Sequence, residues 1–145
     1  MARHLGIDYG TVRVGLAISD SFGIIARPYK TLYNNDLTDL VKDICEIIAE
    51  KKISVIVFGR PLHLSGDESD MFIKIKELAD LISSKCPEIE IHFHDERFSS
   101  IEACGAIRAM GGKPSRNKPK IDAIAASLVL KAYLESVNDG EDIET

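Results

Sequence analysis

Hydrophobic and polar residues alternate along the first part of the chain, and this pattern predicts β-strands. From residue 12 to residue 19 every second side chain is a large aliphatic one, separated by small or polar residues. This period of two is typical of a half-buried strand. Together with residues 4–9 and the turn at Tyr9-Gly10-Thr11, it predicts a β-hairpin. A third extended segment over 24–33 contains Pro28, which we expect near a sheet edge because proline lacks a backbone donor.

The middle of the chain predicts helices and strands in alternation. Apolar residues recur at spacings of three and four over 36–51 and again over 68–85, as in helices that pack one face against a sheet. The short apolar segment 53–58 suits a strand that is buried on both faces. Alternating apolar residues over 89–93 predict a fifth strand.

Two further helices are predicted in the last third of the chain. Ser99 and Glu102 form a capping-box pattern that opens a helix reaching Met110. The final helix is expected over about 121–137, with an acidic frayed tail over 139–145. The apolar residues expected to form the buried face of that final helix are Ile121, Ile124, Ala125, Leu128 and Ala132.

The order of these elements predicts a three-layer α/β domain. Three strands are followed by helix, strand, helix, strand and two helices, which gives a mixed five-stranded sheet with helices on both faces. One side of that sheet is expected to be an antiparallel meander and the other side parallel. No repeat or linker interrupts the 145-residue sequence, so we expect a single domain over residues 1–138.

Composition changes this picture little but argues against several classes of protein. Hydrophobic residues make up 45% of the chain and charged residues 28%, as in ordinary globular domains. No apolar segment approaches the roughly 20 residues that cross a bilayer, so we expect a cytoplasmic protein without a membrane partner. Three cysteines at wide spacings predict free thiols rather than a disulfide framework or a zinc site.

The distribution of charge matters more than the net charge of -5. Residues 103–121 contain five basic side chains and no acidic one, so this strip carries +5. Such a strip is a candidate surface for the phosphates of a nucleic acid. The alternative is a solvated loop whose charges aid solubility. The basic residues of the strip are Arg108, Lys113, Arg116, Lys118 and Lys120.

Acidic residues occupy three places where predicted elements begin or end. Asp8 ends the first strand, Asp95 and Glu96 end the fifth, and Asp122 opens the last helix. Ligands of open α/β sheets bind beyond the carboxyl ends of the parallel strands, so we expect these acids to face one cleft. Taken singly, each has an ordinary explanation as a turn residue, a solvated strand end or a helix cap. Gathered carboxylates need a cation or a proton, and Mg²⁺ or Mn²⁺ suits oxygen ligands.

Four short motifs span nearly the whole chain, in the order residues 6–15 (GIDYGTVRVG), 58–62 (FGRPL) with 65–66 (SG), 95–99 (DERFS) and 120–126 (KIDAIAA). Together, in this order, they resemble the YqgF/RuvX group of ribonuclease-H-like nucleases. Members of that group are described as Holliday junction resolvases and as pre-16S rRNA nucleases.

The resemblance implies a ribonuclease-H-like fold with Asp8, Glu96 and Asp122 as the catalytic, metal-binding acids. Asp95 is second in line in the third motif, because strand alternation alone does not choose between Asp95 and Glu96. Arg60 departs from the second motif, where the group more often has an aliphatic residue. Candidate contacts to the nucleic acid are Arg13, Arg60, Arg97, Lys113, Arg116, Lys118 and Lys120. For Arg97 and Arg13 the alternative role is to orient a neighbouring carboxylate.

The expected function is therefore a Mg²⁺- or Mn²⁺-dependent nuclease that processes the 5' end of precursor 16S rRNA, with ribosomal particles as a further partner. A Holliday junction resolvase acting on branched DNA is the main alternative, and it calls for a symmetric homodimer, whereas RNA processing also suits a monomer. An actin- or Hsp70-like ATPase would need a second domain and another glycine-rich phosphate motif. A non-catalytic RNA-binding adaptor is the remaining alternative.

Overall fold

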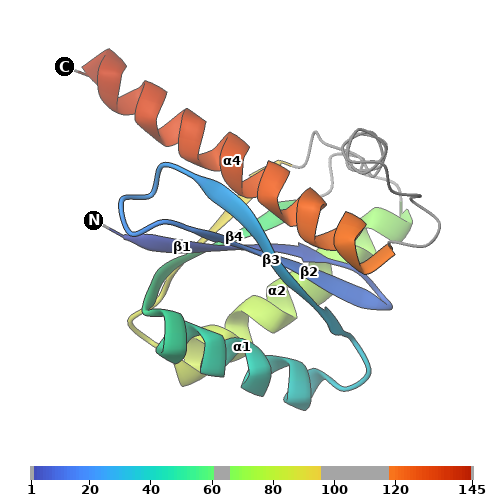
Figure 1. Cartoon of the computed structure of the whole chain (residues 1–145). Coiled ribbons are helices and arrows are strands. Elements are labelled where there is room, and N and C mark those ends of the chain that lie inside the picture. The colour runs from blue at the N-terminus through green and yellow to red at the C-terminus, as the bar shows by residue number, and fades with distance from the viewer. Residues whose placement is uncertain (1, 61–65, 96–117, 145) are drawn as a thin grey trace.

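One mixed sheet of five strands runs through the centre of the molecule in the order β3-β2-β1-β4-β5 (Figure 1). The computed structural model describes residues 2–60, 66–95 and 118–144. β1 pairs antiparallel with β2 and β2 with β3, whereas β1 with β4 and β4 with β5 are parallel. The predicted meander joined to parallel strands is confirmed. The strands are β1 (Arg3–Tyr9), β2 (Arg13–Ser19), β3 (Ala26–Tyr33), β4 (Ile53–Arg60) and β5 (Glu90–Asp95).

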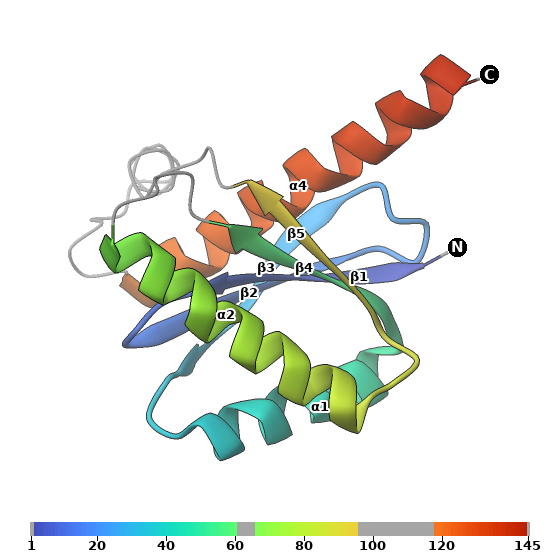
Figure 2. The same cartoon turned by 180° about the vertical axis from the view of Figure 1, so that it is seen from behind.

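Helices cover both faces of this sheet, which confirms the three-layer α/β arrangement. Helices α1 (Leu37–Lys51) and α2 (Gly66–Lys85) lie on one face, and α4 (Lys118–Glu144) crosses the other (Figures 1 and 2). Within the described ranges, no helix is long and apolar enough to cross a membrane. The helix predicted from Ser99 to Met110 lies outside the described residues.

The two faces of the sheet have different cores. Large aliphatic side chains and Phe58 fill the space between the sheet and helices α1 and α2. Burying one such side chain stabilises the fold by about 1.5–3 kcal/mol, so this side carries most of the apolar burial. The core beneath α4 is built from smaller residues, and its members are Ala17, Val55, Val57, Ala126, Val129, Leu130 and Leu134.

The buried face of α4 differs from the predicted one. Of the five predicted residues Ala125 is buried, whereas Ile121, Ile124, Leu128 and Ala132 are only half-buried. The buried apolar residues of the helix are Ala123, Ala125, Ala126, Val129, Leu130 and Leu134. Near Asp122, where the helix lies close to the sheet, the small residues Ala123, Ala125 and Ala126 fill the interface, and Val129, Leu130 and Leu134 fill it farther along the helix. Hydrophobicity along the helix therefore did not identify the contact face.

The bounds of α4 also correct two expectations. Asp122 does not open the helix, because α4 starts at Lys118; it lies one turn inside, where the helix dipole contributes little. The tail expected to fray over 139–145 is helical as far as Glu144. No proline interrupts that segment, and Gly140 costs about 1 kcal/mol relative to alanine, which is too little to end a helix by itself.

A tight turn connects β1 to β2 and is held in place by Asn34, the residue that follows β3. A side chain at Gly10 would bring its Cβ to 2.4 Å from the carbonyl oxygen of Arg13, so the turn requires glycine. Asn34 donates from its backbone N–H to the carbonyl of Val12 and from its side-chain amide to the carbonyl of Gly10, both at 2.9 Å. These two hydrogen bonds fix the turn that follows Asp8.

The edge strand β3 contains Pro28, as predicted. Pro28 pairs with Ala17, and the register between β2 and β3 shifts between Leu16 and Ala17. A bulge at this position accommodates the missing backbone donor, because an irregular edge strand has fewer hydrogen bonds to lose. The sequence argument for an edge position is confirmed.

Two of the three cysteines lie close together as free thiols. The Sγ atoms of Cys45 in α1 and Cys86 after α2 are 3.5 Å apart. Burial, together with the neighbouring Cys86 thiol, raises the pKa of Cys45 to about 11, so Cys45 stays protonated and weakly nucleophilic at neutral pH. The prediction of free thiols is confirmed for this pair, and Cys104 lies outside the described residues.

Candidate active site

Gly15 in β2 allows the backbone of α4 to touch the sheet. A Cβ atom built on Gly15 would lie 2.0 Å from the carbonyl oxygen of Asp122 and 2.3 Å from its carbonyl carbon. Both neighbours are backbone atoms, which cannot rotate away as a side chain can. The absence of a side chain at Gly15 therefore sets the height of the helix above β2 and brings Asp122 down onto the strand.

Asp8 lies on the same face of the sheet, beside this contact. Asp8 and Gly15 are direct partners in the antiparallel pair of β1 and β2, and directly opposite residues project to the same face with Cβ atoms about 4.5–5.5 Å apart. The Asp8 side chain is half-buried. Adding the separation between the Cβ positions of Asp8 and Gly15 to the 2.0 Å between the Gly15 position and the Asp122 carbonyl oxygen puts the Cβ of Asp8 within roughly 7.5 Å of that oxygen. Residues 114 positions apart in sequence meet at this point of the fold.

Arg13 joins the two elements by an ion pair. Its Nε atom donates to Oδ2 of Asp122 at 2.6 Å, and Arg13 precedes Gly15 by two residues, which puts both on the face covered by α4. The side chains of Arg13 and Asp122 are only 26% and 22% exposed. A charge-assisted hydrogen bond of this length fixes the orientation of the carboxylate. The structure therefore brings together three of the predicted site residues, Asp8, Arg13 and Asp122.

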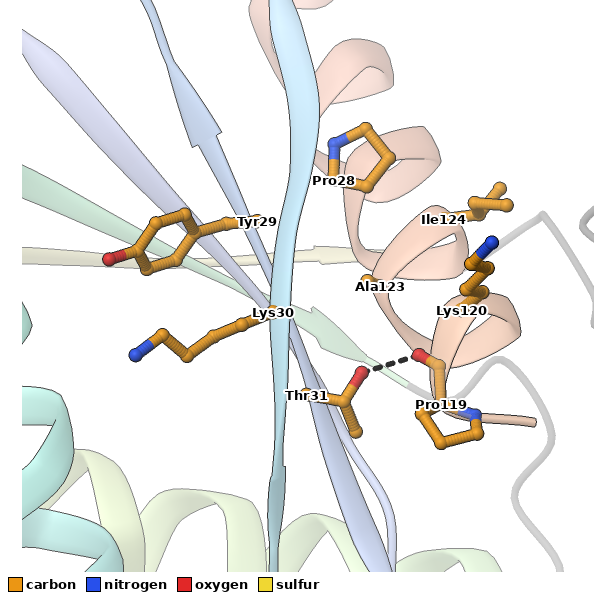
Figure 3. Close-up of a pocket in the computed structure, with 8 residues that line it drawn as sticks. All are labelled: Pro28, Tyr29, Lys30, Thr31, Pro119, Lys120, Ala123 and Ile124. Atoms are coloured by element: carbon orange, nitrogen blue, oxygen red, sulfur yellow. Dashed lines mark hydrogen bonds between the residues drawn. The ribbon is translucent and has the colours of Figure 1, made fainter. Parts of the chain in front are cut away.

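The first turn of α4 is anchored to β3 as well. Thr31 pairs with Gly15 across β2 and β3, and its hydroxyl donates to the carbonyl of Pro119 (Figure 3). This contact holds the helix immediately before Asp122. Sequence reasoning missed both Thr31 and Gly15. An isolated glycine inside a strand pattern is a known signal of close backbone approach, and Gly15 also ends the first of the four motifs.

A groove of about 400 Å³ lies between β3 and the start of α4 (Figure 3). Pro28 and Thr31 face α4 from the strand, whereas Tyr29 and Lys30 point away from the helix. Among the described residues, those that line this groove include no carboxylate. The remaining lining residues are Pro119, Lys120, Ala123 and Ile124. Lys120 is exposed there on the first turn of α4, two residues before Asp122.

Asp95 lies on the opposite face of the sheet from Asp8. It pairs with Arg60 across β4 and β5, two residues beyond the Phe58 and Phe93 pair. The rings of Phe58 and Phe93 stack at 5.7 Å, and Phe93 meets Phe72 of α2 edge-on at 5.5 Å. Strand alternation therefore gives Asp95 and Arg60 the face covered by α2.

Arg60 packs on an aromatic ring of that face. Its guanidinium carbon lies 4.9 Å from the centre of the Phe72 ring, and Nζ of Lys76 lies 5.8 Å from the same ring. A cation over an aromatic face is stabilised by about 0.5–1 kcal/mol at an exposed site. The side chain that departs from the family pattern thus covers α2 instead of pointing to Asp8 and Asp122.

Several predicted site residues are outside the part of the chain that the structure describes. These are Glu96, Arg97, Lys113 and Arg116. Lys118 is the first residue of α4. Within the described ranges, no group of three or more acidic, histidine or cysteine side chains could hold a metal ion. The predicted three-carboxylate set includes Glu96 and so extends beyond those ranges.

Three histidines surround Tyr133 of α4 on the face that also carries Asp8. The ring centres of His4, His92 and His94 lie 5.9, 5.3 and 5.9 Å from that of Tyr133. Burial lowers the pKa of His4, partly offset by the hydrogen bond to the Ala2 carbonyl, and burial raises the pKa of Tyr133. His92 and His94 share this face of β5, and their common neighbour is the aromatic ring of Tyr133.

Comparison with known proteins gives a consistent family. The sequence model described as "RuvX: Holliday junction resolvase" matches residues 2–136. A protein of Sulfurihydrogenibium sp. named "Putative pre-16S rRNA nuclease" is 37% identical over 139 residues, covering 95% of this chain and 93% of the relative. A Fusobacterium nucleatum protein of the same name is 35% identical over 136 residues, covering 93% of this chain and 98% of the relative.

Solved structures match the fold at low sequence identity. One described as "T. thermophilus RuvC in complex with Holliday junction substrate" has a TM-score of 0.60 at 10% identity, covering 92% of this chain and 94% of that one. A fowlpox virus resolvase bound to Holliday junction DNA has a TM-score of 0.53 at 12% identity, covering 93% and 98%. These likenesses confirm the ribonuclease-H-like fold. The family model and the relatives together show that this chain belongs to the RuvX family.

Proposed function

We propose that this protein is a divalent-metal-dependent nuclease that hydrolyses phosphodiester bonds at the 5' end of precursor 16S rRNA, in the cytoplasm. The observation that carries the proposal is the meeting of Asp8 with the Arg13 and Asp122 ion pair on one face of the sheet. The names of the relatives supply the substrate. Half-buried carboxylates from distant segments are costly to gather unless they serve a cation.

The proposed ligands of Mg²⁺ or Mn²⁺ are Asp8, Asp122 and Glu96. Carboxylate oxygens are the donors that these ions prefer, so the side chains present fit the metal. Arg13 engages one oxygen of Asp122, and the other would ligate. The face taken by Asp95 supports the choice of Glu96 in the third motif. When bound, the ion supplies charge stabilisation at the phosphoryl group and activation of water.

The other proposed roles belong to the chain's own basic side chains. Arg13 holds Asp122 in one orientation and offers its remaining N–H groups to the substrate phosphate. Lys120, exposed at the start of α4, is suited to the nucleic-acid backbone beside the site. Arg97, Lys113, Arg116 and Lys118 are proposed for the same backbone. Such contacts position a nucleic acid without reading its sequence.

Branched DNA is the second candidate substrate, because the family model is described as a Holliday junction resolvase. A junction has two equivalent strands to cut, so this reaction calls for two active sites related by a twofold axis. A protein that remains a monomer in analytical ultracentrifugation, with and without a four-way junction, would count against this candidate. Processing of rRNA is compatible with either state.

Side-by-side cleavage assays separate these functions. The purified protein is incubated with a precursor 16S rRNA fragment that spans the mature 5' end and, in parallel, with a four-way DNA junction, in Mg²⁺, Mn²⁺ or a chelator. We expect the RNA to be cut with either ion and neither substrate to be cut in the chelator. Cleavage of the junction alone would transfer the proposal to branched DNA. Cleavage that survives the chelator would refute the metal site, and binding without cleavage would favour an RNA adaptor.

A further inference from the structure

Residues that lie side by side on neighbouring strands form a row across the sheet. The row that contains Asp8 of β1 ends at a histidine on β5, two strands away. Ile7 pairs with Phe58 across β1 and β4, so the next positions, Asp8 and Gly59, lie side by side. Gly59 in turn pairs with His94 across β4 and β5. Neighbouring strands are about 4.8 Å apart, which separates the Cα atoms of Asp8 and His94 by roughly 10 Å.

The two side chains also share a face. His94 meets the Tyr133 ring of α4 edge-on, at an interplanar angle of 85°, so it lies on the face to which Asp8 projects. Gly59 stands between them in the row and contributes no side chain. No side chain of β4 therefore separates the carboxylate from the imidazole within this row.

The chemistry of His94 suits a phosphate oxygen. An imidazole carries at least one N–H donor whether or not it is protonated. Within the described residues, the recorded contact of the His94 ring is with Tyr133, through the ring and not through a hydrogen bond. That contact orients the imidazole and leaves its donor for another partner.

His92 has the same neighbour but a different environment. It lies two residues earlier in β5 and also packs on Tyr133, at 5.3 Å. Its Nε2 atom is 3.3 Å from Oε2 of Glu90, so an acidic side chain already occupies it. The rise of about 3.3 Å per residue puts His92 roughly 6.6 Å farther along the strand than His94.

We propose that His94 is a substrate-binding residue that donates a hydrogen bond to a phosphate oxygen of the nucleic-acid strand held at Asp8. This inference rests on the proposed nuclease function and adds a contact on the β5 side of the site, opposite Arg13. His94 and Arg13 then hold the strand from the two sides of Asp8.

The test compares RNA binding by His94→Ala, His94→Asn and the matched control His92→Ala. Dissociation constants for the precursor rRNA fragment are measured by fluorescence anisotropy in Ca²⁺, used in place of Mg²⁺ to limit cleavage, and melting temperatures are recorded alongside. We expect His94→Ala to weaken binding roughly tenfold, as for a lost hydrogen bond to a charged group. His94→Asn, which keeps an N–H donor, should recover part of the affinity, and His92→Ala should bind as the wild type does.

Two results would overturn the role of His94. Wild-type affinity in His94→Ala would do so, and so would equal losses in His94→Ala and His92→Ala, because equal losses indicate only support of Tyr133. Either result leaves the nuclease proposal standing if Asp8→Asn still abolishes cleavage. A wild-type protein that binds neither the RNA nor the four-way junction would overturn both proposals.

Discussion

An Asp8→Asn variant is expected to cleave precursor rRNA roughly a thousandfold more slowly than the wild type while keeping its fold. Asparagine has the shape of aspartate but lacks the negative charge, so the proposed metal would bind weakly or out of place. Losing the several kcal/mol of charge stabilisation that a metal supplies corresponds to a rate loss of about this size. Single-turnover cleavage at saturating Mg²⁺ measures the effect, and circular dichroism checks the fold.

Asp95→Asn is the matched control for that experiment. Asp95 is also an acid at the carboxyl end of a strand, but its strand position faces α2. We expect this variant to keep wild-type activity within a few-fold. If Asp95→Asn lost as much activity as Asp8→Asn, the assignment of the third motif to Glu96 would be wrong.

Gly15→Ala is expected to destabilise the folded protein strongly. The new Cβ would overlap the carbonyl group of Asp122 at 2.0 Å, and only movement of α4 away from β2 relieves that contact. Overpacking commonly costs about 1–3 kcal/mol, and we expect a loss of about 3 kcal/mol or more because the obstacle is backbone. The free energy of unfolding from urea denaturation measures it.

Gly6→Ala separates a general packing defect from a specific effect on the site. A Cβ on Gly6 would lie 2.8 Å from Cβ of Leu130 and 3.0 Å from the carbonyl oxygen of Ala126, one to two turns beyond Asp122. We expect this variant to be destabilised as well but, at a temperature at which both variants are folded, to keep more activity than Gly15→Ala. If Gly15→Ala unfolded at the same urea concentration as the wild type, the position of α4 would not depend on the close contact between Gly15 and Asp122.

Local patterns in the sequence predicted most of the sheet correctly. The alternation around Leu16 predicted β2 and its hairpin, and Pro28 predicted the edge strand. Both predictions succeeded because they depend only on residues that are close together in the sequence. The contact face of α4 depends on glycines more than a hundred residues away. Hydrophobicity alone predicted that Ile121 and Leu128 are buried against the sheet. The close contact at Gly15 instead places Asp122 next to the sheet.

The choice between Asp95 and Glu96 shows the same dependence on long-range pairing. The two residues are neighbours in the sequence, but the face of the sheet that Asp95 takes depends on the register between β4 and β5. That register is visible only once Phe93 is seen against Phe58 and Phe72. The sequence also predicted that Arg13 could orient a neighbouring carboxylate, but local reasoning did not identify Asp122 as that partner.

Titration of Mn²⁺, followed by electron paramagnetic resonance of the free ion, tests most directly whether Asp8 and Asp122 share a divalent cation. The account predicts that Asp8→Asn and Asp122→Asn each weaken Mn²⁺ binding at least tenfold, about the minimum effect of disturbing the surroundings of a metal site, and that Asp95→Asn binds as the wild type does. Wild-type Mn²⁺ affinity in both Asp8→Asn and Asp122→Asn would contradict it.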